Sequence, residues 1–109
     1  MTMFTGDEGE VISLSTGSDW TANYRAANPG QTKAFFYGQV ILNDILAQAD
    51  CVGIRIYYAI DEEGDKQLVI VGVDEDGNDQ TAGIVADRAK PCPTYCDTGG
   101  STLNDNSSK

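Results

Sequence analysis

Apolar and polar residues alternate most clearly in the segment CVGIRIYYAI, residues 51–60. Alternation with a period of two predicts a β-strand, because successive side chains of a strand point to opposite faces of the sheet. One face of this strand would carry the large apolar side chains Ile54, Ile56, Tyr58 and Ile60. The other, less apolar face would carry Arg55, Tyr57 and Ala59.

A second strand is predicted over QLVIVGVD, residues 67–74, which is apolar at nearly every position. A strand that is apolar on both faces is typical of the middle of a sheet. The polar segment DEEGDK separates the two runs, and its Gly64 tolerates the positive φ of a tight turn. The two strands are therefore expected to form an antiparallel hairpin. TAGIVAD, residues 81–87, and the aromatic segment TKAFFYG, residues 32–38, predict two further short strands.

Helical spacing marks two other segments. In residues 15–30 an apolar stripe repeats at Trp20, Tyr24 and Ala27, and Asn28-Pro29-Gly30 ends the pattern. Thr16 is the expected N-cap, with Asp19 three residues later. The second helix is predicted over GQVILNDILAQAD, residues 38–50, whose apolar side chains share one face: Ile41, Leu42, Ile45, Leu46 and Ala49. We expect Trp20 and Phe35 to belong to the core.

These elements predict the α+β class, as a small two-layer domain with an antiparallel sheet of three to four strands and two helices packed on one face. The length of 109 residues suits one domain. We expect a loose N-terminal arm over residues 1–9 and a single α+β domain over residues 10–97. A disordered C-terminal tail is expected over residues 98–109, where polar residues and Gly predominate.

The charge of the chain limits its partners. Seventeen acidic and seven basic residues leave a net charge of −10, so binding to bare nucleic acid is not expected. An acidic surface instead favours solubility and basic partners. No apolar run approaches the roughly 20 residues of a membrane span, so no membrane association is expected. The N-terminal residues lack the pattern of a signal peptide, which leaves the cytoplasm as the expected location.

Several stretches together resemble a group of short, uncharacterised bacterial proteins. They are WTANYR at residues 20–25, FFYGQVILNDILAQ at 35–48, CVGIRIYYAIDE at 51–62 and LVIVGVDEDGND at 68–79. The resemblance extends over roughly residues 10–96. It implies that this region is a natural unit and that the CPTYC motif at its end belongs to it. It implies no activity, ligand or catalytic residue.

The stretch VDEDGNDQ, residues 73–80, has the composition of a calcium loop. Asp74, Asp76 and Asn78 occupy the first, third and fifth positions of an EF-hand loop. The glycine, however, stands at the fourth position, and Val85 stands where the loop needs a glutamate. We therefore expect a β-turn in which Asp and Asn accept local backbone hydrogen bonds. A weak cation site at the three residues is the alternative.

The cysteines leave three possibilities open. Cys92 and Cys96 are separated by three residues, one more than in thioredoxin-type motifs, and the chain has no histidine to complete a zinc site. Free thiols are the favoured state, with a local disulfide or a metal site as alternatives. Cys51, between a helix and a strand, is expected to be a small core residue. We expect no cofactor and no bound metal.

Catalysis is not expected. Without histidine the chain has no ordinary Ser-His or Cys-His pair, and it lacks the glycine-rich phosphate-binding motifs. Arg55 and Tyr57 are the candidate binding residues, because they share the less apolar strand face. Arg55 would pair either with a carboxylate of its own domain, the favoured alternative, or with an anion of a partner.

The sequence thus favours a non-enzymatic module for protein interaction or self-assembly, acting through a sheet face or edge. The partner would be another protein or a second copy, and the oligomeric state is left open. An alternative is an acidic inhibitor or immunity-type protein that blocks a basic partner such as a nuclease. A third interpretation is a metal or redox module that uses the C-terminal cysteines.

Overall fold

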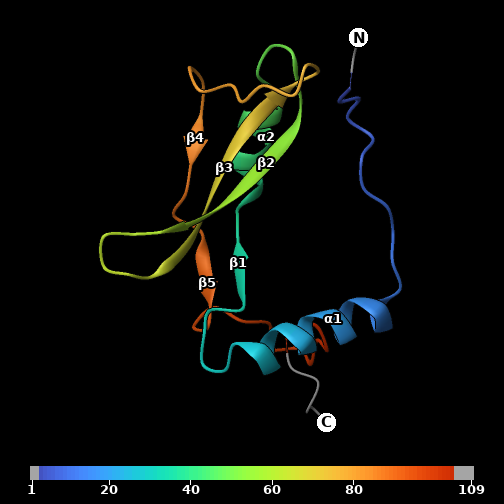
Figure 1. Cartoon of the computed structure of the whole chain (residues 1–109), viewed down its shortest axis with the longest axis vertical. Coiled ribbons are helices and arrows are strands. Elements are labelled where there is room, and N and C mark those ends of the chain that lie inside the picture. The colour runs from blue at the N-terminus through green and yellow to red at the C-terminus, as the bar shows by residue number, and fades with distance from the viewer. Residues whose placement is uncertain (1–2, 105–109) are drawn as a thin grey trace. The chain divides into compact units, whose positions relative to one another are not determined.

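The computed structural model describes residues 3–104, which contain two helices and five strands (Figure 1). The elements follow in the order α1 (Leu14–Ala27), β1 (Ala34–Phe36), α2 (Gln39–Leu46), β2 (Cys51–Ile60), β3 (Lys66–Asp74), β4 (Val85–Ala86) and β5 (Lys90–Cys92). All strand pairs are antiparallel, and they form one sheet of two strands and one of three. The predicted α+β class is confirmed.

The chain divides into two compact units, each built from segments that are distant in sequence. In the described residues, the first unit consists of residues 3–9 and Tyr37–Ala89, and the second of Glu10–Phe36 and residues 90–104. The region predicted as a single domain, residues 10–97, therefore contributes to both units. The expectation of one sheet with two helices on one face is wrong in this respect, since each unit has its own sheet and its own helix.

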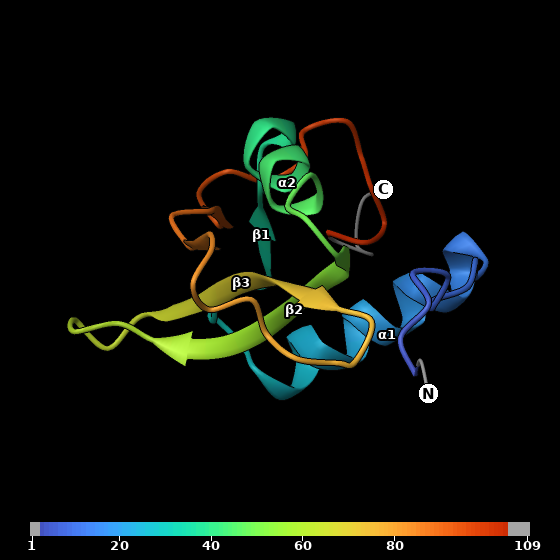
Figure 2. The same cartoon turned by 90° about the horizontal axis from the view of Figure 1, so that it is seen from above.

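The first unit is organised around β3, which lies between β2 and β4. The predicted hairpin and the central position of its second strand are both confirmed, with Ile56 opposite Ile70 and Tyr57 opposite Val69. Helix α2 stacks on one face of this sheet (Figure 2). The core is small, and its fully or almost fully buried side chains in this unit are Ile45, Ile70, Val71 and Val73.

The second unit pairs two short strands that the sequence pattern does not connect. In the β1–β5 pair, Ala34 lies opposite Cys92, Phe35 opposite Pro91 and Phe36 opposite Lys90. Pro91 has no N–H group to donate to a neighbouring strand, and a two-stranded sheet tolerates it because each strand has one open edge. This pairing removes β1 from the larger sheet in which the sequence analysis placed it.

Helix α1 begins earlier than predicted. Its N-cap is Ser13, whose hydroxyl accepts a hydrogen bond of 3.1 Å from the Thr16 backbone N–H, so the expected cap at Thr16 is wrong. The helix ends as predicted, where the Asn28 N–H donates to the Tyr24 carbonyl. Trp20 is 61% exposed rather than in the core, because a two-stranded sheet offers little apolar surface to cover this helix. Phe35 is half-buried.

The segment after β5 is ordered over its described part, residues 97–104. The Asp97 carboxylate accepts hydrogen bonds from the backbone N–H groups of Gly99 (2.9 Å) and Ser101 (3.0 Å). The Thr102 and Ser18 hydroxyls are hydrogen-bonded at 2.5 Å, which joins this segment to α1. Residues 98–104, which belong to the tail predicted as disordered, are thus described with specific hydrogen bonds, and residues 105–109 lie outside the described part of the chain. These polar contacts replace the apolar burial that the composition lacks.

Candidate functional site

The two predicted binding residues, Arg55 and Tyr57, meet a carboxylate of the same unit. Both project from the same face of β2, and Asp79 reaches them from the turn that follows β3. The Arg55 Nη1 lies 2.6 Å from Asp79 Oδ1, and the Tyr57 hydroxyl donates to Asp79 Oδ2. The same Nη1 also donates to the Gly77 carbonyl at 3.1 Å. Arg55 therefore pairs within its own unit, as favoured from the sequence.

This cluster keeps each of its members in one charge state. The hydrogen bond from Tyr57 is the largest cause that lowers the pKa of the Asp79 carboxyl, and Arg55 lowers it further. The same bond to Asp79 raises the pKa of Tyr57, and a hydrogen bond with Asp79 raises the pKa of Arg55. Asp79 thus stays ionised and Tyr57 stays protonated around neutral pH. The arrangement holds a turn in place and is poorly suited to proton transfer, because both carboxylate oxygens are engaged.

A residue at the N-terminal end completes this face of the first unit. The Phe4 ring lies 5.6 Å from the Arg55 guanidinium carbon, and the Phe4 N–H donates to the Glu75 carbonyl at 3.2 Å. Phe4, Gly6 and Glu8, predicted as part of a loose arm, line a groove of about 490 Å³ together with residues 52–56 of β2. The sequence pattern singles out neither Asp79 nor Phe4. Both residues contact Arg55 only because the turn after β3 lies against β2.

The candidate calcium loop is a turn, as predicted. Asp74 Oδ1 accepts hydrogen bonds of 3.0 Å from the backbone N–H groups of both Asp76 and Asn78, and Gly77 has a φ of 85°. An aspartate that accepts from the residues two and four positions later, followed by a positive-φ glycine, recurs at Asp61 and at Asp97. The acidic clusters of this chain are thus explained by turn geometry.

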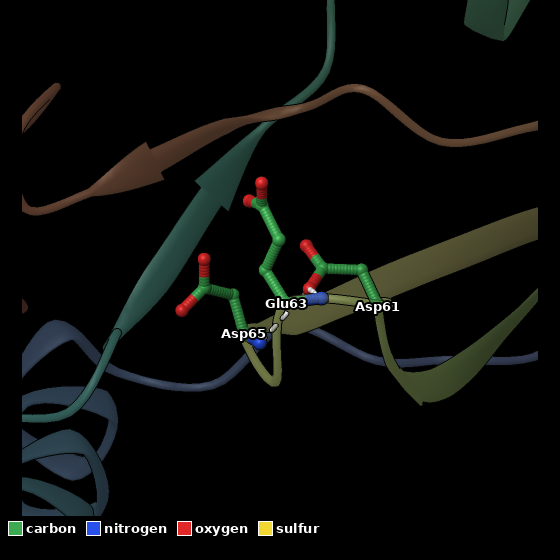
Figure 3. A group of neighbouring side chains, drawn as sticks. All are labelled: Asp61, Glu63 and Asp65. Carbon is green, nitrogen blue, oxygen red and sulfur yellow. Dashed lines mark hydrogen bonds between the residues drawn. The ribbon is translucent and has the colours of Figure 1, made fainter.

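One of these turns brings three acidic groups together. Ligand atoms of Asp61, Glu63 and Asp65 lie within 4.8 Å of one another in the turn between β2 and β3 (Figure 3). The Asp61 carboxylate is directed at the loop backbone, where it accepts from the Glu63 and Asp65 N–H groups at 2.9 Å each. The Gln67 side-chain amide is the first cause that lowers the pKa of Asp61. These bonds orient the Asp61 carboxylate toward the backbone of its own turn.

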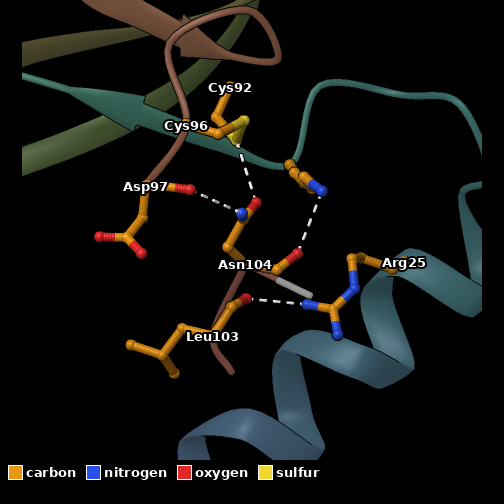
Figure 4. Close-up of a disulfide and its surroundings, with 7 residues drawn as sticks. Arg25, Cys92, Cys96, Asp97, Leu103 and Asn104 are labelled. Atoms are coloured by element: carbon orange, nitrogen blue, oxygen red, sulfur yellow. Dashed lines mark hydrogen bonds between the residues drawn. A yellow bond between two sulfur atoms is a disulfide. The ribbon is translucent and has the colours of Figure 1, made fainter. Parts of the chain in front are cut away.

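The C-terminal cysteines form a disulfide, so the favoured state of free thiols is wrong. Their Cα atoms are 4.8 Å apart, because the CPTYC segment turns back on itself (Figure 4). A sulfur atom that is bonded to another sulfur is not a thiolate ligand, so this state does not provide the candidate metal site at Cys92 and Cys96. Cys51 is free and partly buried rather than a fully buried core residue.

The half of β2 that leads into the hairpin turn exposes large apolar side chains. Ile56, Tyr58 and Ile60 share one face of this strand and are 58%, 95% and 72% exposed. Helix α2 packs on the same sheet but has only eight residues, so it covers the region of Ile70 and does not extend over the hairpin end. We name these three side chains the β2 apolar row. The sequence pattern placed these side chains on the apolar face of the strand, but it does not show how far a helix covers that face.

Comparisons with known proteins return no matching family model, curated protein or solved structure. Within residues 3–104 neither helix is long and apolar enough to cross a membrane.

Proposed function

We propose that this protein is a non-enzymatic self-assembly module in which β2 pairs with β2 of a second copy. The observation that carries the proposal is the β2 apolar row on a strand with an open edge. Within the described residues β2 pairs only with β3, so the backbone groups on its other side face no strand. Exposed, long edge strands with apolar side chains are templates for pairing with another chain.

The features that usually protect an edge strand from pairing with another chain lie outside the hairpin half of β2. The only irregularity of β2 is at Cys51 and Gly53, at the end opposite the apolar row. The strand has no proline, and its only cation, Arg55, is neutralised by Asp79. Phe4, Gly6 and Glu8 line the groove beside residues 52–56 of β2, so Ile56 of the apolar row also lines it, whereas residues 57–60 do not. The hairpin end is thus the accessible part of the edge.

The side chains of this half are complementary to themselves. An antiparallel pair of β2 strands with its two-fold axis at Tyr58 places Tyr58 opposite Tyr58 of the second copy. Ile56 then lies opposite Ile60, so the β2 apolar rows of both copies form one continuous patch. Cross-strand aromatic and β-branched pairs contribute about 0.2–1 kcal/mol each. Three such pairs are too few for tight binding, so we expect a weak dimer.

The charge of the chain predicts how assembly responds to salt. The turn next to the β2 apolar row contains Asp61, Glu62, Glu63 and Asp65, so two copies repel each other electrostatically. Salt screens repulsion between exposed charges and should strengthen a dimer of this acidic chain. The alternative function, inhibition of a basic partner such as a nuclease, predicts the opposite, because salt weakens attraction between unlike charges.

The disulfide bears on the location of the protein. Disulfides persist in oxidising compartments and are rare in the reducing cytosol. We therefore propose an oxidising environment for the form with the Cys92–Cys96 bond, in place of the cytoplasm expected from the sequence.

Sedimentation equilibrium of the purified protein at several salt concentrations tests the assembly. Ile60→Lys should raise the dissociation constant of the dimer at least about tenfold, because it buries a charge in the patch. Val11→Lys is the matched control, since Val11 is 97% exposed and belongs to the second unit. A wild-type protein that stays monomeric at millimolar concentration in high salt would overturn the proposal, as would equal effects of the two substitutions.

A further inference from the structure

The second unit contains a pocket of about 290 Å³ beside the disulfide. Both cysteines line it, and its largest apolar walls are the side chains of Phe35, Phe36, Tyr95 and Leu103. Phe36, Tyr95 and Leu103 are 62%, 57% and 45% exposed, so the apolar wall is open to an incoming molecule. A concave apolar surface with a few polar groups is the usual form of a ligand site. Here a reactive bond is part of the wall.

The disulfide closes a short loop, because it joins residues only four positions apart. In the chain-entropy model such a loop stabilises the folded state by about 2 kcal/mol, less than a long loop does. The loop is also shaped by backbone hydrogen bonds, from the Tyr95 N–H to the Pro91 carbonyl at 2.8 Å and from the Cys96 N–H to the Thr94 carbonyl at 3.1 Å. A contribution of this size leaves the placement of the bond at the pocket unexplained.

The two sulfur atoms are in different surroundings. Cys92 is 5% exposed and lies on strand β5, whereas Cys96 is half-buried. The Cys92 Sγ is 3.4 Å from Asn104 Oδ1, as drawn in Figure 4. A disulfide sulfur has no proton to donate, but a Cys92 thiol would donate to this oxygen. The reduced form thus gains a hydrogen bond that the oxidised form cannot make.

The pocket that both cysteines line also contains one cation, Lys33, and one carboxylate, Asp97. Lys33 lines the same pocket, and its ammonium group donates to the Asn104 carbonyl at 3.0 Å. A nearby cation stabilises a thiolate, which makes it a better leaving group in disulfide exchange. Cys96 is the sulfur that a partner can reach, and Cys92 is the sulfur that the protein can release.

We propose that the Cys92–Cys96 bond is a thiol–disulfide exchange site for a dithiol peptide with an apolar residue beside its cysteine. A thiolate of the peptide attacks Cys96 Sγ, the Cys92–Cys96 bond breaks, and a mixed disulfide forms while Cys92 leaves as a thiolate and takes up a proton. The second peptide thiol, after losing its proton, attacks the peptide sulfur of the mixed disulfide and releases Cys96, which is protonated in turn. The peptide is oxidised by two electrons and the pair Cys92/Cys96 is reduced by two.

The rate of this exchange tests the proposal, measured in a Cys51→Ser background so that one disulfide is the only reactive group. The reference is an oxidised synthetic peptide of residues 89–98, which has the same ring without the pocket. A dithiol peptide with a phenylalanine beside its cysteine should reduce the protein at least about tenfold faster than it reduces the reference ring. Leu103→Ser should remove most of this advantage, whereas Val40→Ser, an exposed apolar position of the first unit, should leave it unchanged.

Two further measurements identify the sulfur that is attacked and the class of thiol that attacks it. Mass spectrometry of the mixed disulfide, trapped by acid quenching and alkylation of the free thiols in the Cys51→Ser protein, should locate the adduct at Cys96. Glutathione separates the sources of the thiol, since an equal acceleration with glutathione supports exchange and assigns it to small thiols. Equal rates for protein and reference ring with both reagents would overturn the proposal, and so would an adduct at Cys92. Loss of the folded signal of Trp20 on reduction would also overturn it, because the bond would then be structural.

Discussion

Arg55 and Asp79 form an ion pair with Nη1 and Oδ1 2.6 Å apart, and this pair joins strand β2 to the turn that follows β3. The Tyr57 hydroxyl donates to the second oxygen of the same carboxylate. The turn that carries Asp79 is therefore attached to the sheet at a point where the backbone has only an isolated bridge, between Val73 and Asp79. Two polar side chains on the less apolar face of β2, Arg55 and Tyr57, together with Asp79 of the turn, take the place of an additional strand.

The first prediction concerns the acid stability of this cluster. Because folding lowers the pKa of Asp79 below its unfolded value of about 3.9, its contribution to stability is present above that value and is lost as pH falls through the folded pKa. Asp79→Asn should lower the urea midpoint at pH 6. The difference in midpoint between this variant and wild type should be smaller at pH 2 than at pH 6. Urea unfolding monitored by circular dichroism at both pH values measures this. A variant deficit that is equal at pH 6 and at pH 2 would show that the carboxylate charge is not responsible.

The second prediction compares two glycines in equivalent turns. Gly64 and Gly77 have φ values of 88° and 85°, so alanine is strained at both by about 1 kcal/mol. A Cβ at Gly64 would meet open space, whereas a Cβ at Gly77 would overlap the Phe4 ring. Gly77→Ala should therefore destabilise the first unit by at least about 1 kcal/mol more than Gly64→Ala. Chemical denaturation of both variants gives the difference.

Phe4→Ala in the Gly77→Ala background supplies the control for that comparison. The double variant should recover much of the additional loss, because the ring that blocks the new methyl group is gone. No recovery would mean that residues 3–9 do not pack against the turn.

The third prediction concerns the start of α1. Ser13→Ala removes the hydroxyl that accepts from the Thr16 N–H and should cost about 1 kcal/mol of the stability of the second unit. Thr16→Ala leaves that acceptor in place and should cost less. Trp20, the only tryptophan of the chain, lies in this helix and reports its unfolding by fluorescence. A greater loss for Thr16→Ala would return the cap to the position expected from the sequence.

The fourth prediction tests the core of the first unit. Val71 is 3% exposed on the central strand, so Val71→Asp buries an unpaired carboxylate and should cost about 4 kcal/mol or more. Val85→Asp, at a position of β4 that is 54% exposed and pairs with Val71, is the matched control and should cost less than about 1 kcal/mol. Thermal unfolding by circular dichroism separates the two, and similar melting temperatures for the variants would contradict the central position of β3.

Local patterns by themselves determined the β2–β3 hairpin, the turns at Gly64 and Gly77, the start of helix α2 and the end of α1 at Asn28. Helix α2, predicted to continue to residue 50, ends at Leu46. Each of these depends on residues within a few positions of one another, where alternation, helical spacing and glycine conformation act directly. The start of α1 was misjudged by three residues, from Thr16 to Ser13, because Ser, Thr and Gly are all acceptable caps and the sequence offers several. The turn interpretation of residues 73–80 was correct for the same local reason.

Only the tertiary structure decided the relationships between distant segments. The pairing of β1 with β5, the ion pair of Arg55 with Asp79 and the contact of Phe4 with the turn at Gly77 each join residues that no periodicity connects. The exposure of the β2 apolar row was equally hidden, because an apolar strand face is buried only as far as the covering helix extends. A sequence specifies which faces of its helices and strands are apolar. The length and placement of neighbouring elements determine which of these faces are buried.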